Sequence, residues 1–180
     1  MDPVRNGLRA VVTAEAPGTY PLTGTANGRT YRGTAVVDDP LTPIAVANPW
    51  TVQLIDGSAP RERPLGSWTT FAPAYSGSAI YTTTFDLTAA DLAGRRLTLD
   101  LGEVHDLATV TVNGVTLPAA LWHPYTVDVT SALTAGTNTV SVRVTNTLAN
   151  SRNKILPSGL LGPVTLRPQA VLTTTLGAIR

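Results

Sequence analysis

The chain has 180 residues, of which 43% are hydrophobic and 14% are charged. This composition is too apolar and too weakly charged for a disordered protein, and the length fits one domain, or one domain with part of a second. The net charge is +1 and the basic residues are scattered, so we expect neither nucleic acid nor a membrane as a partner. No apolar run approaches the roughly 20 residues of a membrane span. The absence of cysteine excludes disulfides and thiolate chemistry.

Short runs of alternating apolar and polar residues, separated by turn residues, predict an all-β protein. In the first part of the chain, strands are expected at residues 8–14, 19–25 and 29–37. Asn27 and Gly28 predict a tight hairpin, because both residues accept a positive φ. Three prolines within residues 38–49 then indicate a linker. We therefore interpret residues 1–40 as a β-strand segment, the remnant or edge of a preceding β domain.

The second part of the chain, residues 46–168, has the stronger strand pattern. Strands are expected at residues 50–54, 78–86, 95–101, 108–112, 115–117, 125–129, 139–147 and 160–166. Roughly eight or nine strands of this length are typical of an antiparallel β-sandwich of the jelly-roll type. The fold predicted for the whole chain is therefore such a sandwich, preceded by a short β-hairpin segment, and residues 169–180 are expected to form a C-terminal tail.

Local signals refine the second part. Residues 56–73 are polar and rich in Pro and Gly, which predicts a long loop. Thr88, with Asp91 three residues later, predicts one capped helical turn. Asn113 and Gly114 predict a second hairpin.

Several segments of the second part occur in a familiar order. Residues 76–81 (SGSAIY), 99–104 (LDLGEV) and 112–114 (VNG) together resemble the sugar-binding jelly-roll domain of glycoside hydrolase family 2-like enzymes, which is of the galactose-binding-domain-like class. Four more segments are similar to the C-terminal region of glycoside hydrolase family 106-like proteins, which include α-L-rhamnosidases. These are residues 121–125 (LWHPY), 127–130 (VDVT), 136–138 (GTN) and 158–164 (SGLLGPV). The resemblance covers residues 46–168 and implies a domain that accompanies a catalytic domain in the same protein.

One loop departs from the family pattern. After the long alternating strand the family usually has Asn-Thr-Trp, any residue, and then Asn-Arg. In this chain Leu148 stands in place of the Trp and Ser151 in place of the Arg. The role of that loop in the family is therefore open for this chain.

Candidate sugar-binding residues lie in the predicted loops. A sugar site needs a flat aromatic surface for the C–H face of the ring and a few fixed hydrogen-bond partners, which loops at one end of a sandwich can provide. We consider Trp68 in the long loop, and Trp122, His123 and Tyr125 in a connection between strands, as candidates. The alternative is that Trp68 and Trp122 cover the core and that Tyr125 points inward.

Polar candidates follow the longest alternating strand. Asn150, Arg152 and Asn153 have side chains that bond well to pairs of hydroxyls. The alternative for Asn150, and for Asn146 nearby, is that the side-chain amide ties down its own loop. Arg152 and Asn153 are the freer pair.

Catalysis by this chain alone is not expected. Glycoside hydrolysis normally requires two carboxylates about 5 to 9.5 Å apart. Glu103 and Asp106 are close in sequence, but such a pair at a strand end is more typical of a solvated turn or an internal salt bridge. His105 beside Asp106 lacks a nucleophile for a triad.

We expect no cofactor, although jelly rolls of the implied class often hold a structural calcium ion through loop carboxylates. No ligand-spacing motif supports such an ion here. The carboxylates available for it are Asp38, Asp39 and Asp56.

Two functions remain open from the sequence. The first is a non-catalytic carbohydrate-binding accessory domain of a secreted bacterial glycoside hydrolase, acting on polysaccharide or oligosaccharide that contains rhamnose. The alternative is a structural sandwich that packs on a glycosidase catalytic domain in cis, or completes its active-site rim, without binding sugar. Residues 1–4 lack the basic and apolar regions of a signal peptide, so secretion would belong to the larger protein.

Overall fold

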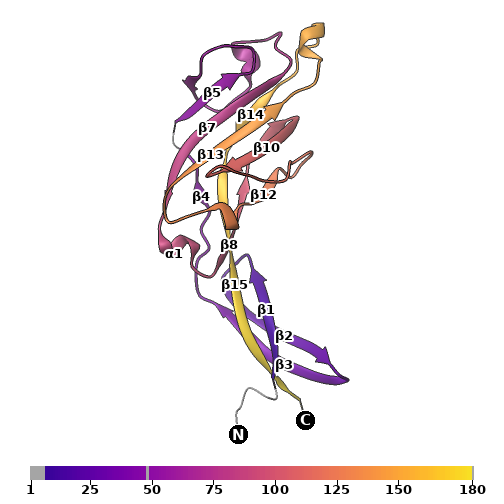
Figure 1. The fold of residues 1–180 in the computed structure, drawn as a ribbon. Coiled ribbons are helices and arrows are strands. Elements are labelled where there is room, and N and C mark those ends of the chain that lie inside the picture. Colours follow the sequence, from indigo (N-terminus) through magenta and orange to yellow (C-terminus); the bar gives the residue numbers. More distant parts are fainter. Residues whose placement is uncertain (1–6, 48, 180) are drawn as a thin grey trace. The chain divides into compact units, whose positions relative to one another are not determined.

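The computed structural model describes residues 7–47 and 49–179, drawn as a ribbon in Figure 1. The signal-peptide prediction for residues 1–4 lies outside this part. No helix within it is long and apolar enough to cross a bilayer. The chain divides into two compact units, which we describe separately. Unit 1 comprises Met1–Thr42, Ala93–Arg96 and Pro168–Arg180, and unit 2 comprises Pro43–Leu92 and Leu97–Arg167.

Unit 1 is an antiparallel sheet in the strand order β2–β3–β15–β1. Its strands are β1 (Gly7–Ala14), β2 (Gly18–Ala26), β3 (Arg29–Val37) and the C-terminal part of β15 (Thr165–Ala178). The three predicted strands are confirmed, and so is their hairpin, since Asn27 and Gly28 have φ values of 50° and 73°. Residues 169–178, which we expected to form a tail, belong to β15. This part of β15 pairs with every residue of β1.

A small set of apolar side chains holds unit 1 together. Ala14, Val37, Leu41 and Ala170 are buried there, with Tyr20 partly buried against them. The Arg95 guanidinium forms an ion pair with Asp39, whose carboxylate also accepts a hydrogen bond from the Leu41 N–H at 3.2 Å. The Leu41 amide, and then Arg95, hold the pKa of Asp39 below its ordinary value.

Unit 2 contains a six-stranded antiparallel sheet in the order β11–β10–β13–β7–β5–β6. Its strands are β5 (Trp50–Leu54), β6 (Arg61–Arg63), β7 (Ser78–Leu87), β10 (Leu107–Val112), β11 (Val115–Thr116) and β13 (Gly136–Thr145). Facing strands are β4 (Ile44–Ala45), β8 (Arg95–Asp100), β9 (Glu103–His105), β12 (Thr126–Asp128), β14 (Gly159–Gly162) and the start of β15. This arrangement confirms the predicted all-β antiparallel sandwich.

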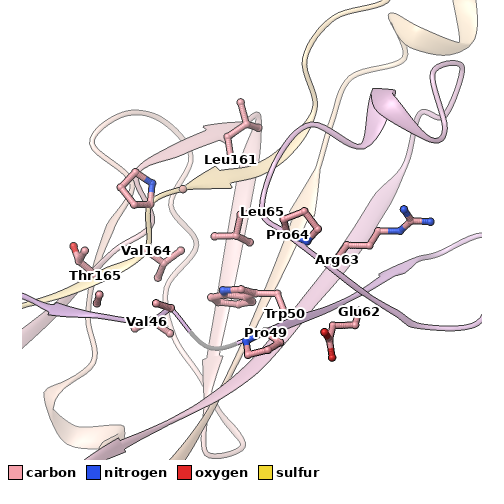
Figure 2. Close-up of a pocket in the computed structure, with 14 residues that line it drawn as sticks. Val46, Pro49, Trp50, Glu62, Arg63, Pro64, Leu65, Leu161, Val164 and Thr165 are labelled. Atoms are coloured by element: carbon pink, nitrogen blue, oxygen red, sulfur yellow. The ribbon is translucent and has the colours of Figure 1, made fainter.

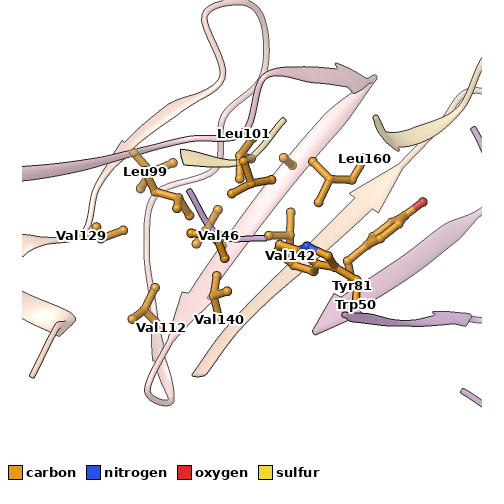
Figure 3. Close-up of a cluster of buried hydrophobic side chains, with 14 of the residues drawn as sticks. Val46, Trp50, Tyr81, Leu99, Leu101, Val112, Val129, Val140, Val142 and Leu160 are labelled. Atoms are coloured by element: carbon orange, nitrogen blue, oxygen red, sulfur yellow. The ribbon is translucent and has the colours of Figure 1, made fainter. Parts of the chain in front are cut away.

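The core of unit 2 lies between these layers, as Figure 3 shows. The predicted inward faces are confirmed, because the alternate side chains of β8 and β13 are fully or almost fully buried. They are Leu97, Leu99 and Leu101 on one side, and Val140, Val142 and Val144 on the other. Burying one such side chain stabilises the fold by roughly 1.5–3 kcal/mol, so these two rows provide much of the driving force for packing the sandwich.

Short helices punctuate the strands. They are η2 (Trp68–Thr70), α1 (Ala89–Leu92), η3 (Thr130–Ala132) and η4 (Asn150–Arg152). The predicted capped turn is confirmed at α1, where the Asp91 N–H donates to Thr88 Oγ1 at 3.2 Å and the Thr88 N–H donates to Asp91 Oδ2 at 2.8 Å. The predicted long loop at residues 56–73 is interrupted by β6 and η2.

Two asparagines join separate turns inside unit 2. Asn138 is fully buried, and its Oδ1 accepts hydrogen bonds from Asn113 Nδ2 at 2.8 Å and from the Thr134 N–H at 2.9 Å. Its Nδ2 donates to the carbonyls of Thr134 and Gly136. Asn113, at φ 49° in the predicted hairpin, donates from Nδ2 to the Ala132 carbonyl as well. The amide pair therefore fixes the β10–β11 hairpin against the turn before β13.

Replacing Asn138→Ala should lower the free energy of unfolding by about 2–4 kcal/mol, because it removes the hydrogen bonds of a fully buried amide to Asn113, Thr134 and Gly136. Urea unfolding would measure the change. Ser131→Ala, an exposed change nearby, should alter stability by less than about 0.5 kcal/mol. Equal effects of the two variants would contradict the role given to Asn138.

Tyr81 on β7 is a buried phenol whose hydroxyl has no hydrogen-bond partner in the described part of the chain. Burial raises the pKa of Tyr81 to about 12. The nearby Leu160 N–H lowers this pKa only in part, and it does not meet the geometry of a hydrogen bond to the hydroxyl. A Cβ at Gly159 would lie 2.3 Å from the hydroxyl oxygen, so only glycine leaves room for the ring there.

The pH dependence of stability should report this burial. The unfolded chain loses the tyrosine proton near pH 10, whereas the folded chain keeps it until about pH 12. The stabilisation that the protonated Tyr81 provides is therefore complete below pH 10. The free energy of unfolding should fall by roughly 2–3 kcal/mol as the pH rises to about 12. Urea unfolding at pH 8 and at pH 11.5, with Tyr81→Phe as control, tests this. The variant should lack this loss and should be no less stable at pH 8, since no hydrogen bond is removed.

Candidate functional site

A hollow of about 450 Å³ opens beside β9 in unit 2. The residues that line it include Glu103, His105, Asp106, His123 and Tyr125. The first three lie on β9 and just after it, and the last two lie in the Trp122 loop, which we define as residues 117–125. The structure thus brings two predicted site residues, His123 and Tyr125, together with three groups that the sequence offered only as a turn.

Asp106 joins the segments around the hollow. Its N–H donates to the Thr145 carbonyl at 3.1 Å, and its own carbonyl accepts from the Tyr125 hydroxyl at 2.6 Å. Its carboxylate Oδ2 accepts from the Thr147 N–H at 3.1 Å. Thr147 belongs to the Asn150 loop, which we define as residues 146–158. Both loops are therefore tied to one residue.

The protonation of Tyr125 suits its role as a donor. Partial burial, and then the negative charge of Asp106, raise the pKa of its hydroxyl above the ordinary value. The phenol therefore keeps its proton at physiological pH and holds the bond to the Asp106 carbonyl.

The carboxylates of the hollow have partners within the chain. Glu103 Oε1 lies 2.9 Å from His105 Nε2, and Asp106 holds the Thr147 amide.

Trp122 carries the exposed aromatic surface of this region. Its side chain is 72% exposed, and it directly precedes His123 in the wall of the hollow. The loop that presents it is fastened by the backbone, since Ala108 and Ala120 exchange N–H to carbonyl bonds at 3.0 and 2.8 Å. The indole is therefore held in water by a fixed loop.

Trp68 cannot serve as the second aromatic platform, which corrects our prediction. Its side chain is 0% exposed and packs edge-on against Tyr75, with ring centroids 5.6 Å apart. The backbone N–H of Trp68 donates to the Ser158 carbonyl at 2.9 Å, which holds the long loop against the Asn150 loop. Contacts between segments far apart in sequence thus bury the ring.

Asn150 is also corrected, because it is only 1% exposed and cannot meet a ligand. Its Oδ1 accepts from the Leu156 N–H at 2.8 Å, and its Nδ2 donates to the Leu156 carbonyl and to Ser158 Oγ. Asn146 Nδ2 bonds the same Ser158 oxygen at 3.0 Å. Asn150 therefore ties down its own loop, which was the alternative set out from the sequence, whereas Asn146 also joins this loop to the backbone of Tyr75 and Gly77.

Arg152 and Asn153 are exposed in the Asn150 loop, at the end of η4 and just beyond it. Neither lines the hollow. Their proposed contact with sugar hydroxyls stays a prediction.

A second groove, of about 680 Å³, lies elsewhere on unit 2 and was not found from the sequence (Figure 2). Its lining is mostly apolar, with Pro49, Trp50, Pro64, Leu65 and Val164 among the side chains labelled in the figure. Trp50 is 4% exposed, as expected of a core residue. The groove forms where β5 and β6 approach the β14–β15 connection, and no local pattern in the sequence marks such an approach.

No group of three or more His, Asp or Glu side chains in the described ranges is placed to hold a metal ion. Of the carboxylates considered for calcium, Asp39 binds Arg95 and Leu41. Asp56 accepts from the Ser58 N–H at 2.8 Å, and hydrogen bonds from Ser58 lower its pKa.

Comparison with known families decides the relationship. Residues 71–167 match the family described as glycosyl hydrolase 2 galactose-binding domain-like. The chain belongs to this family. The galactose-binding-like fold inferred from the segments in the second part of the chain is thus confirmed.

Relatives with known structures share the fold of this galactose-binding-like domain. A rhamnosidase from Novosphingobium sp. PP1Y is 27% identical, with a TM-score of 0.63, and the match covers 90% of this chain and 21% of that one. An FMN-binding beta-glucuronidase from Facaelibacterium prausnitzii L2-6 is 22% identical, with a TM-score of 0.59, covering 71% and 22% of the two chains. At 22% identity, the similarity to the beta-glucuronidase concerns the fold alone.

A protein of Formosa agariphila, to which a beta-glucuronidase activity is ascribed, is 34% identical over 118 residues. The match covers 60% of this chain and 10% of that protein. The galactose-binding-like domain thus spans about a tenth of the curated relative and about a fifth of the two solved structures.

Asn150→Ala should loosen the Asn150 loop of this galactose-binding-like domain, since it removes the three hydrogen bonds to Leu156 and Ser158. We expect a loss of about 2–4 kcal/mol in the free energy of unfolding and faster amide exchange at Leu156. Exchange followed by NMR measures this, with Arg152→Ala as the exposed control. An unchanged Leu156 amide would contradict the structural role of Asn150.

Proposed function

We propose that this galactose-binding-like domain is a non-catalytic carbohydrate-binding accessory domain of a secreted glycoside hydrolase. The observation that carries the proposal is the 72% exposure of Trp122, which directly precedes His123 in the lining of the hollow. Sugars present hydroxyls and an apolar C–H face, and the region offers imidazole, phenol and carboxylate groups together with one indole surface.

The glycan class follows from chemistry and relationship together. Rhamnose carries a methyl group in place of one hydroxymethyl group, which adds apolar surface for contact with an indole. The relative at 27% identity is named a rhamnosidase. Glycans that contain rhamnose are therefore the first ligands to test. A shallow, open site of this kind should bind with a Kd in the micromolar to millimolar range, roughly −8 to −4 kcal/mol.

A second function is favoured by a different observation. The apolar groove around Trp50 could accept apolar side chains of a glycosidase catalytic domain in cis, so that the sandwich packs on that domain or completes its active-site rim without binding sugar. The match to only a fraction of its relatives' length agrees with a partner domain in the same protein.

Affinity electrophoresis against soluble polysaccharides separates the two functions. The panel is rhamnogalacturonan, gum arabic, galactan and xylan. Retardation by at least one polymer supports glycan binding. Normal migration in every gel overturns it and leaves the docking function.

Trp122→Ala should weaken binding to the retarding polymer by at least about tenfold, because the stacking surface is lost. Its free energy of unfolding should change by less than about 0.5 kcal/mol, since the side chain is exposed. Leu148→Ala, an exposed apolar change in the Asn150 loop, is the matched control and should bind normally. Binding that survives Trp122→Ala would move the site away from the hollow.

A further inference from the structure

The charge of the hollow is one-sided. Two acidic residues, Glu103 and Asp106, are among the residues that line it, and both are exposed. Carboxylates are ionised at neutral pH. None of the described residues that line the hollow is Arg or Lys. The other polar groups are the imidazoles of His105 and His123 and the phenol of Tyr125.

One guanidinium on a neighbouring strand is already paired. Arg167 on β15 forms an ion pair with Asp100, the last residue of β8. Asp100 Oδ1 also accepts from the Gly102 N–H at 2.8 Å, at the edge of the hollow. This cation is therefore balanced by its own carboxylate.

A uronic acid would bring a further carboxylate into this region. Proteins usually meet such a group with Arg, whose fork of N–H donors matches the two oxygens. The hollow offers like charge instead, and like charges a few ångströms apart repel. Neutral hydroxyls meet no such cost, because carboxylates and imidazoles accept hydrogen bonds from them.

We infer that the hollow selects neutral sugar residues, among them deoxy sugars, and rejects uronic acids. This inference rests on the proposed glycan binding and names the class of sugar for it.

Matched polymers test the selectivity. Rhamnogalacturonan and gum arabic both contain uronic acids, and reducing their carboxyl groups converts these to neutral hexoses on the same backbone. Binding of each native and reduced form, and of neutral galactan and xylan, is measured by isothermal titration at pH 8, above the ordinary titration range of imidazole. The neutral forms should bind at least about fivefold more tightly than the native acidic forms, the factor expected from one like-charge contact near 4 Å in water.

Salt and charge variants locate the effect. The ratio of the affinities for the reduced and native polymers should fall in 0.5 M NaCl, where exposed charges are screened over less than about 5 Å. The double variant Glu103→Gln, Asp106→Asn should bring the native and reduced forms within about twofold of each other. Asn keeps an oxygen that can accept the Thr147 N–H, so the loop contact can persist. Glu62→Gln, in the apolar groove, is the control and should leave the ratio unchanged.

The outcomes are distinct. A native acidic polymer that binds as tightly as its reduced form overturns the selectivity and leaves glycan binding in place. A ratio that survives the double variant, or that Glu62→Gln abolishes, also overturns it. Failure of every polymer, acidic or neutral, overturns the proposed function and the selectivity together.

Discussion

The geometry of the candidate site depends on how Asp106 is bound on three sides. Its amide is held by the Thr145 carbonyl of β13, its carbonyl holds the Tyr125 hydroxyl, and its carboxylate holds the Thr147 amide. Two of these three contacts use the backbone of Asp106, so the path of the backbone positions the residues that line the hollow. The side chain adds the contact to the Asn150 loop. The sandwich holds Asp106 in place through β13, and the hydrogen bonds of Asp106 position the two loops.

The regular part of the fold could be predicted from the sequence because its signals are local. Asn27 and Gly28 mark a hairpin through their positive φ, and the alternating valines of β13 mark a buried face. The last strand continues beyond Pro168, where we expected a C-terminal tail. Proline ends a strand only where its missing N–H is needed. In β15 it falls between the residues paired with β4 and those paired with β1.

The site was harder to predict because burial of a loop residue is a long-range property. Trp68 stands in a polar, proline-rich stretch that gives no sign of a core position. Its burial comes from the approach of residues 158 and 159, about ninety positions later, where a Cβ at Gly159 would lie 3.1 Å from the indole. Asn150 is similar, since an amide that could meet a sugar is equally able to satisfy its own backbone. The exposure of Trp122 likewise depends on the three-dimensional fold. So does the position of His123 in the same hollow as Glu103 and His105.

The Trp122 loop is fastened by backbone bonds at Ala120 and by one hydroxyl at Tyr125. The side chains at positions 121–123 contribute nothing to that fastening. Substitutions at these three positions should therefore be tolerated without loss of stability. The same separation makes the segment a convenient place to vary when a lectin of chosen specificity is selected from a library.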